Sequence, residues 1–510
     1  MMRRVLVYCA LFVLPAPVAA QSGRLAGLDA YITTAIHDWR IPGVAVAIVK
    51  DDSVVLARGY GVRRAGGRKP VDARTLFGVA SNTKAMTAAA LAILVDEGKL
   101  RWDDRVIDYL PWLRLWDPWV TRELRIRDLL CHRNGLPAYG GDITIWGSTH
   151  TRREDLVRLR FLEPATSFRS AYAYENNMFI AAGEVVEAVT GERWDDFLRE
   201  RIFAPLGMTR TTTSFATATG DSDVTTPHIF VDGAVRPIAW RNVENLGAAA
   251  AVNSDAADMA QWIRLQLRHG SWAGGRIFSA AASYQMWSPQ TIIPLAPDSL
   301  QARPVAMFAA YGLGWSMRDY GGRKVLTHGG WTDGMLSRVA LVPAEHLGLV
   351  VLTNMHNRDI GPALMYRIID AYLGGPAFDW SGYALQRERE GEARDSAALA
   401  RQQRERVPGT RPSLPLAAFA GLYHNDVYGE ARISADSGGL TIRMLASPTF
   451  VGTLEHWHYD TFRPHWQDPV LESHLMPFTI DAAGAVRSFT LNLGAFIDPA
   501  TYTFTRAAEP

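Results

Sequence analysis

A serine and a lysine at helical spacing are the first residues in this chain whose types could do chemistry. Ser81 and Lys84 open a helix-forming run that ends before Gly98, so both side chains are expected on one face, about one turn apart. A serine hydroxyl becomes a nucleophile when a base takes its proton, and a lysine with a lowered pKa can be that base. The spacing alone more often marks an N-capping serine followed by a solvated lysine.

Lysine usage supports a function for Lys84. The chain has five lysines among 53 basic residues, and the others are arginine. Arginine cannot give up its proton and cannot serve as a base. Lys84 is the only lysine with a serine three residues before it, which favours the chemical interpretation.

Tyr174 and Asn176 form the second candidate segment. A phenol beside a lysine ammonium is expected to have a lowered pKa, which suits it to act as a base, and the asparagine could hold the lysine amine. The alternative is a structural role for both residues, as a loop tyrosine and a turn asparagine before a helix at 177–190. The same Tyr-x-Asn spacing occurs again at 423–425, and that second segment is assigned no catalytic role.

The third segment is His328-Gly329-Gly330-Trp331, expected directly after a strand at 324–327. Glycines beside a strand permit close backbone approach by a substrate, and an edge strand can pair with an extended peptide. The amides of Trp331 and Ser81 could form an oxyanion hole. A glycine-rich turn between strands is the alternative.

The surrounding pattern predicts one sheet built from both ends of a long first domain, with helices inserted between. The predicted fold is α/β (α+β), an antiparallel sheet flanked by helices with a helical subdomain. Strands are expected at 44–49, 53–57, 311–317, 324–327, 336–342 and 347–352, and helices at 27–39, 81–97, 177–190, 360–373 and from 254 onward.

Composition divides the remaining chain. Residues 379–412 are charged and rich in Ala and Gln, which is typical of a linker, in part helical. Residues 413–510 carry short extended runs between turns, which predicts a small antiparallel all-β domain, a β-barrel or a sandwich. The serine hydrolase domain is expected over 21–378.

The first twenty residues resemble a signal peptide, with Arg3 and Arg4, an apolar run at 5–14 and small residues before Gln21. The run is too short to span a bilayer. The sequence therefore predicts an exported protein, periplasmic or secreted, without a membrane span.

Charge and cysteine content exclude other classes. A net charge of +1 gives no basic footprint for nucleic acid. Removal of the leader would take Cys9 and leave Cys131 alone, so no internal disulfide is expected, and Cys131 is expected to be buried. His456, His458 and Asp460 could form a metal site, but their alternation favours one face of a β-strand.

In this order, the three segments resemble those of the serine β-lactamase and penicillin-binding-protein superfamily. They are most similar to the branch with class C β-lactamases, D-aminopeptidases and family VIII esterases, known as peptidase family S12. The C-terminal region resembles the lipocalin-like domain of some members. The resemblance covers roughly residues 25–375. It includes the sequences at 77–81, 126–136 and 184–191 in addition to the three motifs.

This resemblance implies an acyl-enzyme mechanism without a metal or organic cofactor. It makes Ser81 the nucleophile, Lys84 and Tyr174 the proton-transfer partners and Asn176 the residue that orients Lys84. The Ser81 and Trp331 amides would hold the oxyanion, and 328–330 would line the substrate edge. Histidine at 328, where β-lactamases usually have lysine, lacks a fixed charge for a substrate carboxylate.

The predicted function is hydrolysis of small peptides or amides, as in D-aminopeptidases. A carboxylesterase, a weak β-lactamase, a penicillin-binding-like receptor without turnover and a catalytically silent scaffold are the alternatives. The substrate would be a small molecule or a short peptide, and a homo-oligomer remains open. The β domain could cap the active site of its own or a neighbouring chain.

Overall fold

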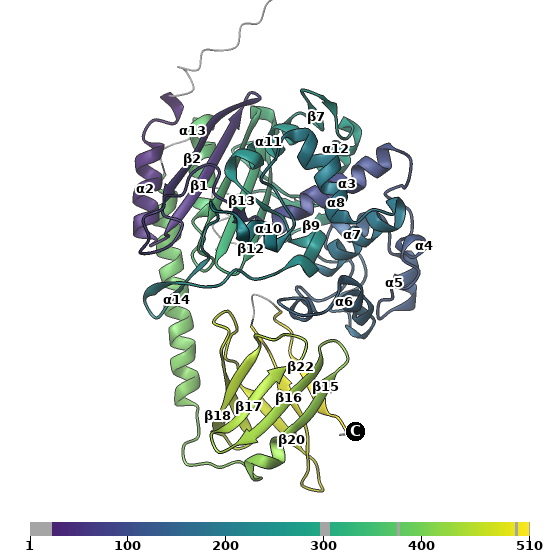
Figure 1. Ribbon diagram of the computed structural model, residues 1–510, viewed down its shortest axis with the longest axis vertical. Helices are drawn as coiled ribbons and strands as arrows, with labels where there is room; N and C mark the ends of the chain where they lie inside the picture. The colour runs from purple at the N-terminus through teal and green to yellow at the C-terminus, as the bar shows by residue number, and fades with distance from the viewer. Residues whose placement is uncertain (1–22, 296–305, 375–377, 495–497, 509–510) are drawn as a thin grey trace, which may run out of the picture.

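The computed structural model describes residues 23–295, 306–374, 378–494 and 498–508. The predicted leader at 1–20 lies outside these ranges. The described chain forms a large part built on an eight-stranded sheet and a small part that is an eight-stranded closed barrel. One long helix connects the two parts (Figure 1).

The large sheet is antiparallel and draws strands from both ends of the first domain, as predicted. Its order is β2-β1-β14-β13-β12-β11-β10-β9. The strands are β1 (Gly43–Lys50), β2 (Ser53–Gly61), β9 (Thr291–Ile292), β10 (Ala309–Tyr311), β11 (Ser316–Tyr320), β12 (Arg323–Thr332), β13 (Met335–Val342) and β14 (Leu347–Thr353).

Three predicted strands were wrong in extent. The strand expected at 53–57 continues to Gly61. The strand expected at 311–317 is split by a turn, in which the Gly312 amide donates to the Trp315 carbonyl at 2.7 Å and Gly314 takes a positive φ of 75°. The strand expected at 324–327 continues to Thr332. The His-Gly-Gly-Trp segment therefore lies within β12 and not after it.

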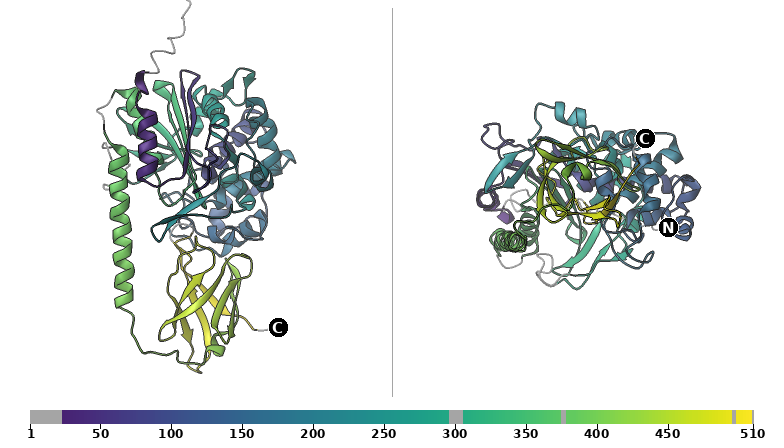
Figure 2. Two further views of the ribbon diagram at one scale, coloured as in Figure 1. Left: turned by 60° about the vertical axis from the view of Figure 1, so that its left-hand side comes forward. Right: turned by 90° about the horizontal axis from the view of Figure 1, so that it is seen from below.

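Helices cover both faces of the sheet (Figures 1 and 2). Along β1, Val44, Val46 and Ile48 pack with α2 (Leu28–Asp38) and α13 (Gly361–Leu373). The alternate residues of β1 join the core on the other face, with α3 (Thr83–Asp96) and α11 (Ala256–Leu267). Burial on both faces explains the uninterrupted apolar run of β1.

Short elements make up the helical subdomain beside the sheet. Its helices are α4 (Val106–Tyr109), α5 (Pro118–Glu123), α6 (Arg152–Arg158), α7 (Asn177–Thr190), α8 (Trp194–Leu198), α9 (Ala204–Leu206), α10 (Phe215–Gly220) and α12 (Ala280–Met286). Three short strand pairs lie outside the large sheet in the described part of this domain: β3 (Phe77–Gly78) with β6 (Asn253–Ser254), β4 (His228–Val231) with β5 (Ala234–Pro237), and β7 (Ser271–Trp272) with β8 (Gly275–Arg276).

The predicted linker is mostly one helix, α14 (Trp380–Arg404). Asp379 caps its first turn by accepting from the Gly382 amide at 3.0 Å. Its buried residues are in the first turns, and Glu392 in its middle still pairs with Arg358 of the large domain at 2.6 Å. Most of its second half is exposed, as expected for a polar helix that bridges domains. Figure 2 shows α14 running along the outside of the molecule toward the far end of the barrel.

The C-terminal part is a closed antiparallel barrel, as predicted. Its buried face is rich in aromatic residues, including Phe419, Phe478 and Phe489. Its strands are β15 (Gly421–Asn425), β16 (Gly429–Asp436), β17 (Gly439–Met444), β18 (Val451–His458), β19 (Thr461–Trp466), β20 (Met476–Ile480), β21 (Val486–Leu491) and β22 (Tyr502–Arg506).

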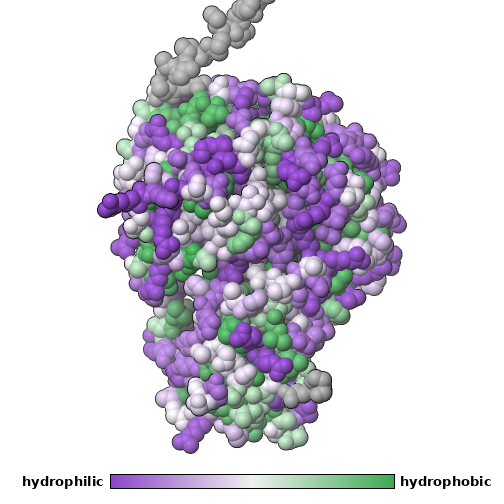
Figure 3. Space-filling model, in the orientation of Figure 1, coloured by the Kyte–Doolittle hydropathy of each residue, from purple (hydrophilic) through white to green (hydrophobic). Residues whose placement is uncertain are grey.

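The surface carries a mixture of side chains. On the face drawn in Figure 3, hydrophilic residues dominate, and hydrophobic residues occur in scattered patches. Among the residues that the structure describes, no helix has the length and apolar character to cross a membrane.

Candidate active site

Ser81 lies at the point where the chain turns from β3 into α3. The preceding Ala80 has a positive φ of 46°, an uncommon conformation for a residue with a side chain. A short 3-10 turn, Ala80–Asn82, then continues into α3. One turn along, the Lys84 amine lies 3.1 Å from the Ser81 hydroxyl, so the predicted helical spacing does bring the two groups together.

The three contacts of Lys84 fit both of its protonation states, because an ammonium can donate to all three oxygens. Its Nζ donates to Asn176 Oδ1 at 2.5 Å and to the Ala249 carbonyl at 3.1 Å. A neutral amine has two hydrogens and one lone pair, so with both hydrogens donated to oxygens the lone pair can accept from the Ser81 hydroxyl. Complete burial is the main cause that lowers the pKa of Lys84 to about 7, against the opposing charges of Asp142 and Glu175.

Tyr174 is next to this pair, but its pKa is shifted opposite to the expectation from the sequence. The Lys84 amine lies 4.8 Å from the centre of the phenol ring. Burial raises the pKa of Tyr174 well above its usual value, and hydrogen bonding with Ser81 offsets the rise only in part. The predicted lowering was wrong because the cost of removing the phenolate from water outweighs the effect of the neighbouring lysine.

Three buried residues that the motif analysis missed surround these groups. Asp142 accepts from Asn176 Nδ2 at 2.6 Å and fixes the amide that holds Lys84. Glu175 accepts from Asn134 Nδ2 at 2.7 Å, and burial raises its pKa to about 7. The His132 ring lies 4.3 Å from that of Tyr174, centre to centre.

His328 lies in the wall of the site as a neutral ring. Its Nδ1 is 2.7 Å from the Gly329 carbonyl, and its Nε2 is 2.7 Å from the Tyr311 hydroxyl. A carbonyl only accepts, which assigns the proton to Nδ1 and makes Nε2 the acceptor from Tyr311. Burial lowers the pKa of His328 to about 3, with help from Lys84. A fixed positive charge is therefore absent at this position.

Gly330 serves close packing within the chain itself. A Cβ at this position would lie 2.2 Å from the Val79 carbonyl, 2.3 Å from Ser337 Oγ and 3.1 Å from the Ser81 amide nitrogen. The glycine lets β12 lie directly against the segment that carries Ser81. Gly330 also lines the cavity, as the sequence predicts, and its lack of a side chain brings the candidate oxyanion donors, the amides of Ser81 and Trp331, close together.

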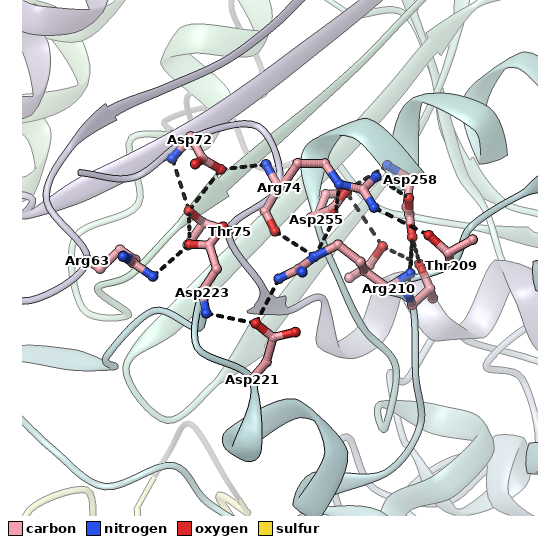
Figure 4. Close-up of polar contacts among 12 residues, drawn as sticks. Arg63, Asp72, Arg74, Thr75, Thr209, Arg210, Asp221, Asp223, Asp255 and Asp258 are labelled. Carbon is pink, nitrogen blue, oxygen red and sulfur yellow. Dashed lines mark hydrogen bonds and ion pairs between the residues drawn. The ribbon is translucent and has the colours of Figure 1, made fainter. Parts of the chain in front are cut away.

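A polar network joins the segment before β3, which leads to Ser81, to the start of α11 (Figure 4). Arg74 pairs with Asp258 at 2.8 Å and with Asp255 at 3.4 Å, at the start of α11. Thr75 donates to Asp223 at 2.9 Å. Because these residues flank the paired strands β3 and β6, they fix the backbone that leads into the nucleophile position.

Ser81 and its neighbours in the candidate site open onto one cavity of about 370 Å³. Its lining includes Ser81, Tyr174, Asn176 and the whole segment from His328 to Trp331, and the Trp331 ring stacks on Trp146 at 4.9 Å. β11 pairs with β12 only as far as Thr327, so the following residues of β12 face the cavity. All eight residues singled out from the sequence lie in or around this one site.

Other candidates stand apart from it. Cys131 is buried, as predicted, and burial raises the pKa of its thiol to about 12. Tyr423 is in the barrel core and donates to the Phe419 carbonyl at 2.8 Å. His456 and His458 lie on β18, and the described residues contain no group of three or more potential metal ligands.

Comparison with known proteins places the large domain. A family model described as Beta-lactamase matches residues 28–372. The chain belongs to the β-lactamase family. A second model, described as a domain of unknown function (DUF3471), matches residues 405–506, which covers the barrel.

Individual relatives extend this result. The unguisins hydrolase ungD of Aspergillus violaceofuscus is 30% identical over 435 residues, 79% of this chain and 75% of the relative. An octameric penicillin-binding protein homologue from Pyrococcus abyssi has a TM-score of 0.61 at 20% identity, over 94% of this chain and 100% of that one. A D-stereospecific amidohydrolase from Streptomyces has a TM-score of 0.54 at 24% identity, over 69% and 99%. The resemblance to the β-lactamase and penicillin-binding-protein superfamily is confirmed, and this family member is a serine hydrolase.

Proposed function

We propose that this family member hydrolyses small peptides or amides through an acyl-enzyme on Ser81. One observation carries the proposal. The Lys84 amine donates its hydrogens to Asn176 and Ala249 and directs its third contact at the Ser81 hydroxyl, 3.1 Å away. A buried, neutral lysine in hydrogen-bond reach of a serine is the arrangement that activates a nucleophile.

In the acylation step, the Ser81 oxygen attacks the substrate carbonyl while Lys84 takes the hydroxyl proton. The amides of Ser81 and Trp331, brought together by Gly330, are the proposed donors to the oxyanion. Tyr174 keeps its proton at neutral pH because burial raises its pKa. It is therefore suited to protonate the leaving amine, and the resulting phenolate regains a proton from the Lys84 ammonium.

Deacylation uses Lys84 a second time. Water attacks the acyl carbonyl while Lys84 takes a proton from it, and the Ser81 oxygen leaves with the proton that Lys84 carries. After the two steps the amide bond is replaced by an acid and an amine, and each side chain has its original proton. The steps need no metal ion or organic cofactor.

The neutral His328 bears on the choice of substrate. Its buried, uncharged ring provides no charge to hold a substrate carboxylate, which supports amides or esters over penicillins. The amidohydrolase activity named for the Streptomyces neighbour also supports an amide substrate. An esterase with the same machinery is the second candidate, because it needs no further group.

The proposal includes export to the periplasm or the medium, on the strength of the leader-like residues at 1–20. A homo-oligomer is also proposed, by analogy with the octameric neighbour. The lipocalin-like character of the barrel stays an interpretation of its closed eight-stranded topology.

A substrate panel tests the reaction class. Purified protein is given a D-alanyl p-nitroanilide, its L-counterpart, a p-nitrophenyl ester and a penicillin, with Ser81→Ala in parallel. We expect turnover of an anilide or the ester by wild type, little hydrolysis of the penicillin, and loss of each activity in the variant. Faster turnover of the penicillin than of both other classes would contradict the proposal.

A further inference from the structure

The barrel of the same chain makes buried polar contacts with the loop that leads to Asp142. The Gly141 amide donates to Asp498 Oδ2 at 2.9 Å and lies 3.0 Å from the Tyr502 hydroxyl. Tyr502 in turn donates to Asp498 Oδ2 at 2.8 Å. Both barrel side chains are buried, so water does not readily replace these contacts.

The contacts continue without a break to the proposed base. Gly141 is followed by Asp142, whose carboxylate accepts from Asn176 Nδ2 at 2.6 Å. The other end of that amide, Asn176 Oδ1, accepts from the Lys84 amine at 2.5 Å. Every side chain in this row is buried, and a row of buried hydrogen bonds transmits small displacements because the interior is close-packed.

We propose that Asp498 is a positioning residue for Lys84, through its hold on Gly141 and the Asp142–Asn176 pair. The barrel is then a component of the active site and not an independent module. This inference rests on the proposed function. It goes beyond it because it assigns a role in the reaction to a residue more than 300 positions away from the helix that carries Ser81.

The charges around Asp142 and Lys84 predict how the pH dependence of the reaction changes when Asp498 is replaced. Burial and the Asp498 carboxylate raise the pKa of Asp142. Without the Asp498 charge, Asp142 would ionise more readily, hold the Lys84 ammonium more firmly, and raise the pKa of the lysine. The other groups that face this pair are Glu175, His132, His328 and Tyr174 from the large domain, Tyr139 from the loop, and Tyr428 and Tyr502 from the barrel.

Two variants of the full chain separate contact from charge. Asp498→Ala removes the anchor of Gly141, and we expect kcat to fall about 10- to 100-fold, with KM changed much less. Asp498→Asn keeps an oxygen that can accept from Gly141 but loses the charge. We expect it to retain more activity and to move the acidic limb of the kcat/KM profile to higher pH.

Asp436→Asn is the matched control. Asp436 makes the same type of local contact, accepting from the Gly438 amide at 2.7 Å, but it lies at the exposed end of β16, away from the loop. Active sites are titrated with a fluorophosphonate, and thermal unfolding is recorded, so that kcat refers to folded protein only.

The inference is overturned if both Asp498 variants match Asp436→Asn in kcat per titrated site and in pH profile. It is also overturned if Asp498→Ala loses only folded protein while kcat per site and the pH profile stay at the wild-type values. Ser81→Ala is measured in the same series. An active Ser81→Ala would refute the proposed function, whereas an inactive one beside unaffected Asp498 variants would refute only the role of the barrel.

Discussion

Lys84→Arg is expected to lower kcat/KM by about 10²- to 10⁴-fold, the range that general acid–base catalysis contributes. The substitution keeps a positive charge and hydrogen-bond donors beside Asn176, but arginine does not lose its proton near neutral pH. The proposed base would therefore be lost while a cation stays in the site. Steady-state kinetics on the substrate of highest turnover measures the effect.

Lys324→Arg is the matched control, because Lys324 is exposed and donates to the Trp287 carbonyl outside the cavity. We expect its activity to stay at the wild-type level. Equal activity of Lys84→Arg and Lys324→Arg would show that the positive field of Lys84, and not its loss of a proton, is what the site requires.

The same lysine sets the pH dependence of the wild type. The active form is the neutral amine, and the pKa of Lys84 is about 7, so kcat/KM should rise with pH through this value. Glu175, whose pKa is also about 7, titrates over the same pH range. The acidic side of the pH profile therefore reports Lys84 and Glu175 together and not Lys84 alone. The loss of activity at high pH should lie above pH 10, because the pKa of Tyr174 is raised.

Arg241→Ala is expected to destabilise the protein by about 3–5 kcal/mol, the cost of leaving a buried charge without its partner. The Arg241 guanidinium pairs with Asp333 of the large domain and, at 2.6 Å, with Asp468 of the barrel. Both carboxylates are buried. Because Asp333 also accepts from the Trp146 indole at 3.1 Å, and Trp146 stacks on Trp331, activity should fall as well.

Arg268→Ala is the comparison for this loss of a cation. Arg268 pairs with Asp52 at 3.0 Å, with side chains 39% and 40% exposed, and such a pair contributes about 0–1 kcal/mol. Urea unfolding followed by tryptophan fluorescence measures both variants. If Arg241→Ala unfolds at the same urea concentration as Arg268→Ala, the two ion pairs of Arg241 do not stabilise the structure as described.

The sequence predicted the fold wherever a pattern depends on local spacing. The apolar run of β1, the helix at 177–190 and the barrel strands follow periodicities that packing on one or two faces enforces. The limits of β12 were missed because its glycines suggest a turn, whereas Gly330 is required by the Val79 carbonyl that packs against it. The helix α14 was interpreted as a linker because its charged composition, typical of connecting segments, is also typical of solvent-exposed helices.

The site was predictable only in part. Motif spacing brought out Ser81, Lys84, Tyr174 and the β12 segment, because these groups must meet at one substrate atom. Asp142 gave no signal, since it acts by holding Asn176 from a loop whose path depends on the barrel. The direction of the Tyr174 pKa shift was also beyond the sequence, because it depends on how far the phenol is removed from water.

The central claim is tested most directly by mass spectrometry of the intact protein during turnover of a slowly deacylated p-nitrophenyl ester. We expect wild type to gain the mass of one acyl group, peptide mapping to place it on Ser81, and Ser81→Ala to gain none. Lys84→Arg should acylate far more slowly. An adduct on another residue, or turnover by Ser81→Ala at the wild-type rate, would contradict the account.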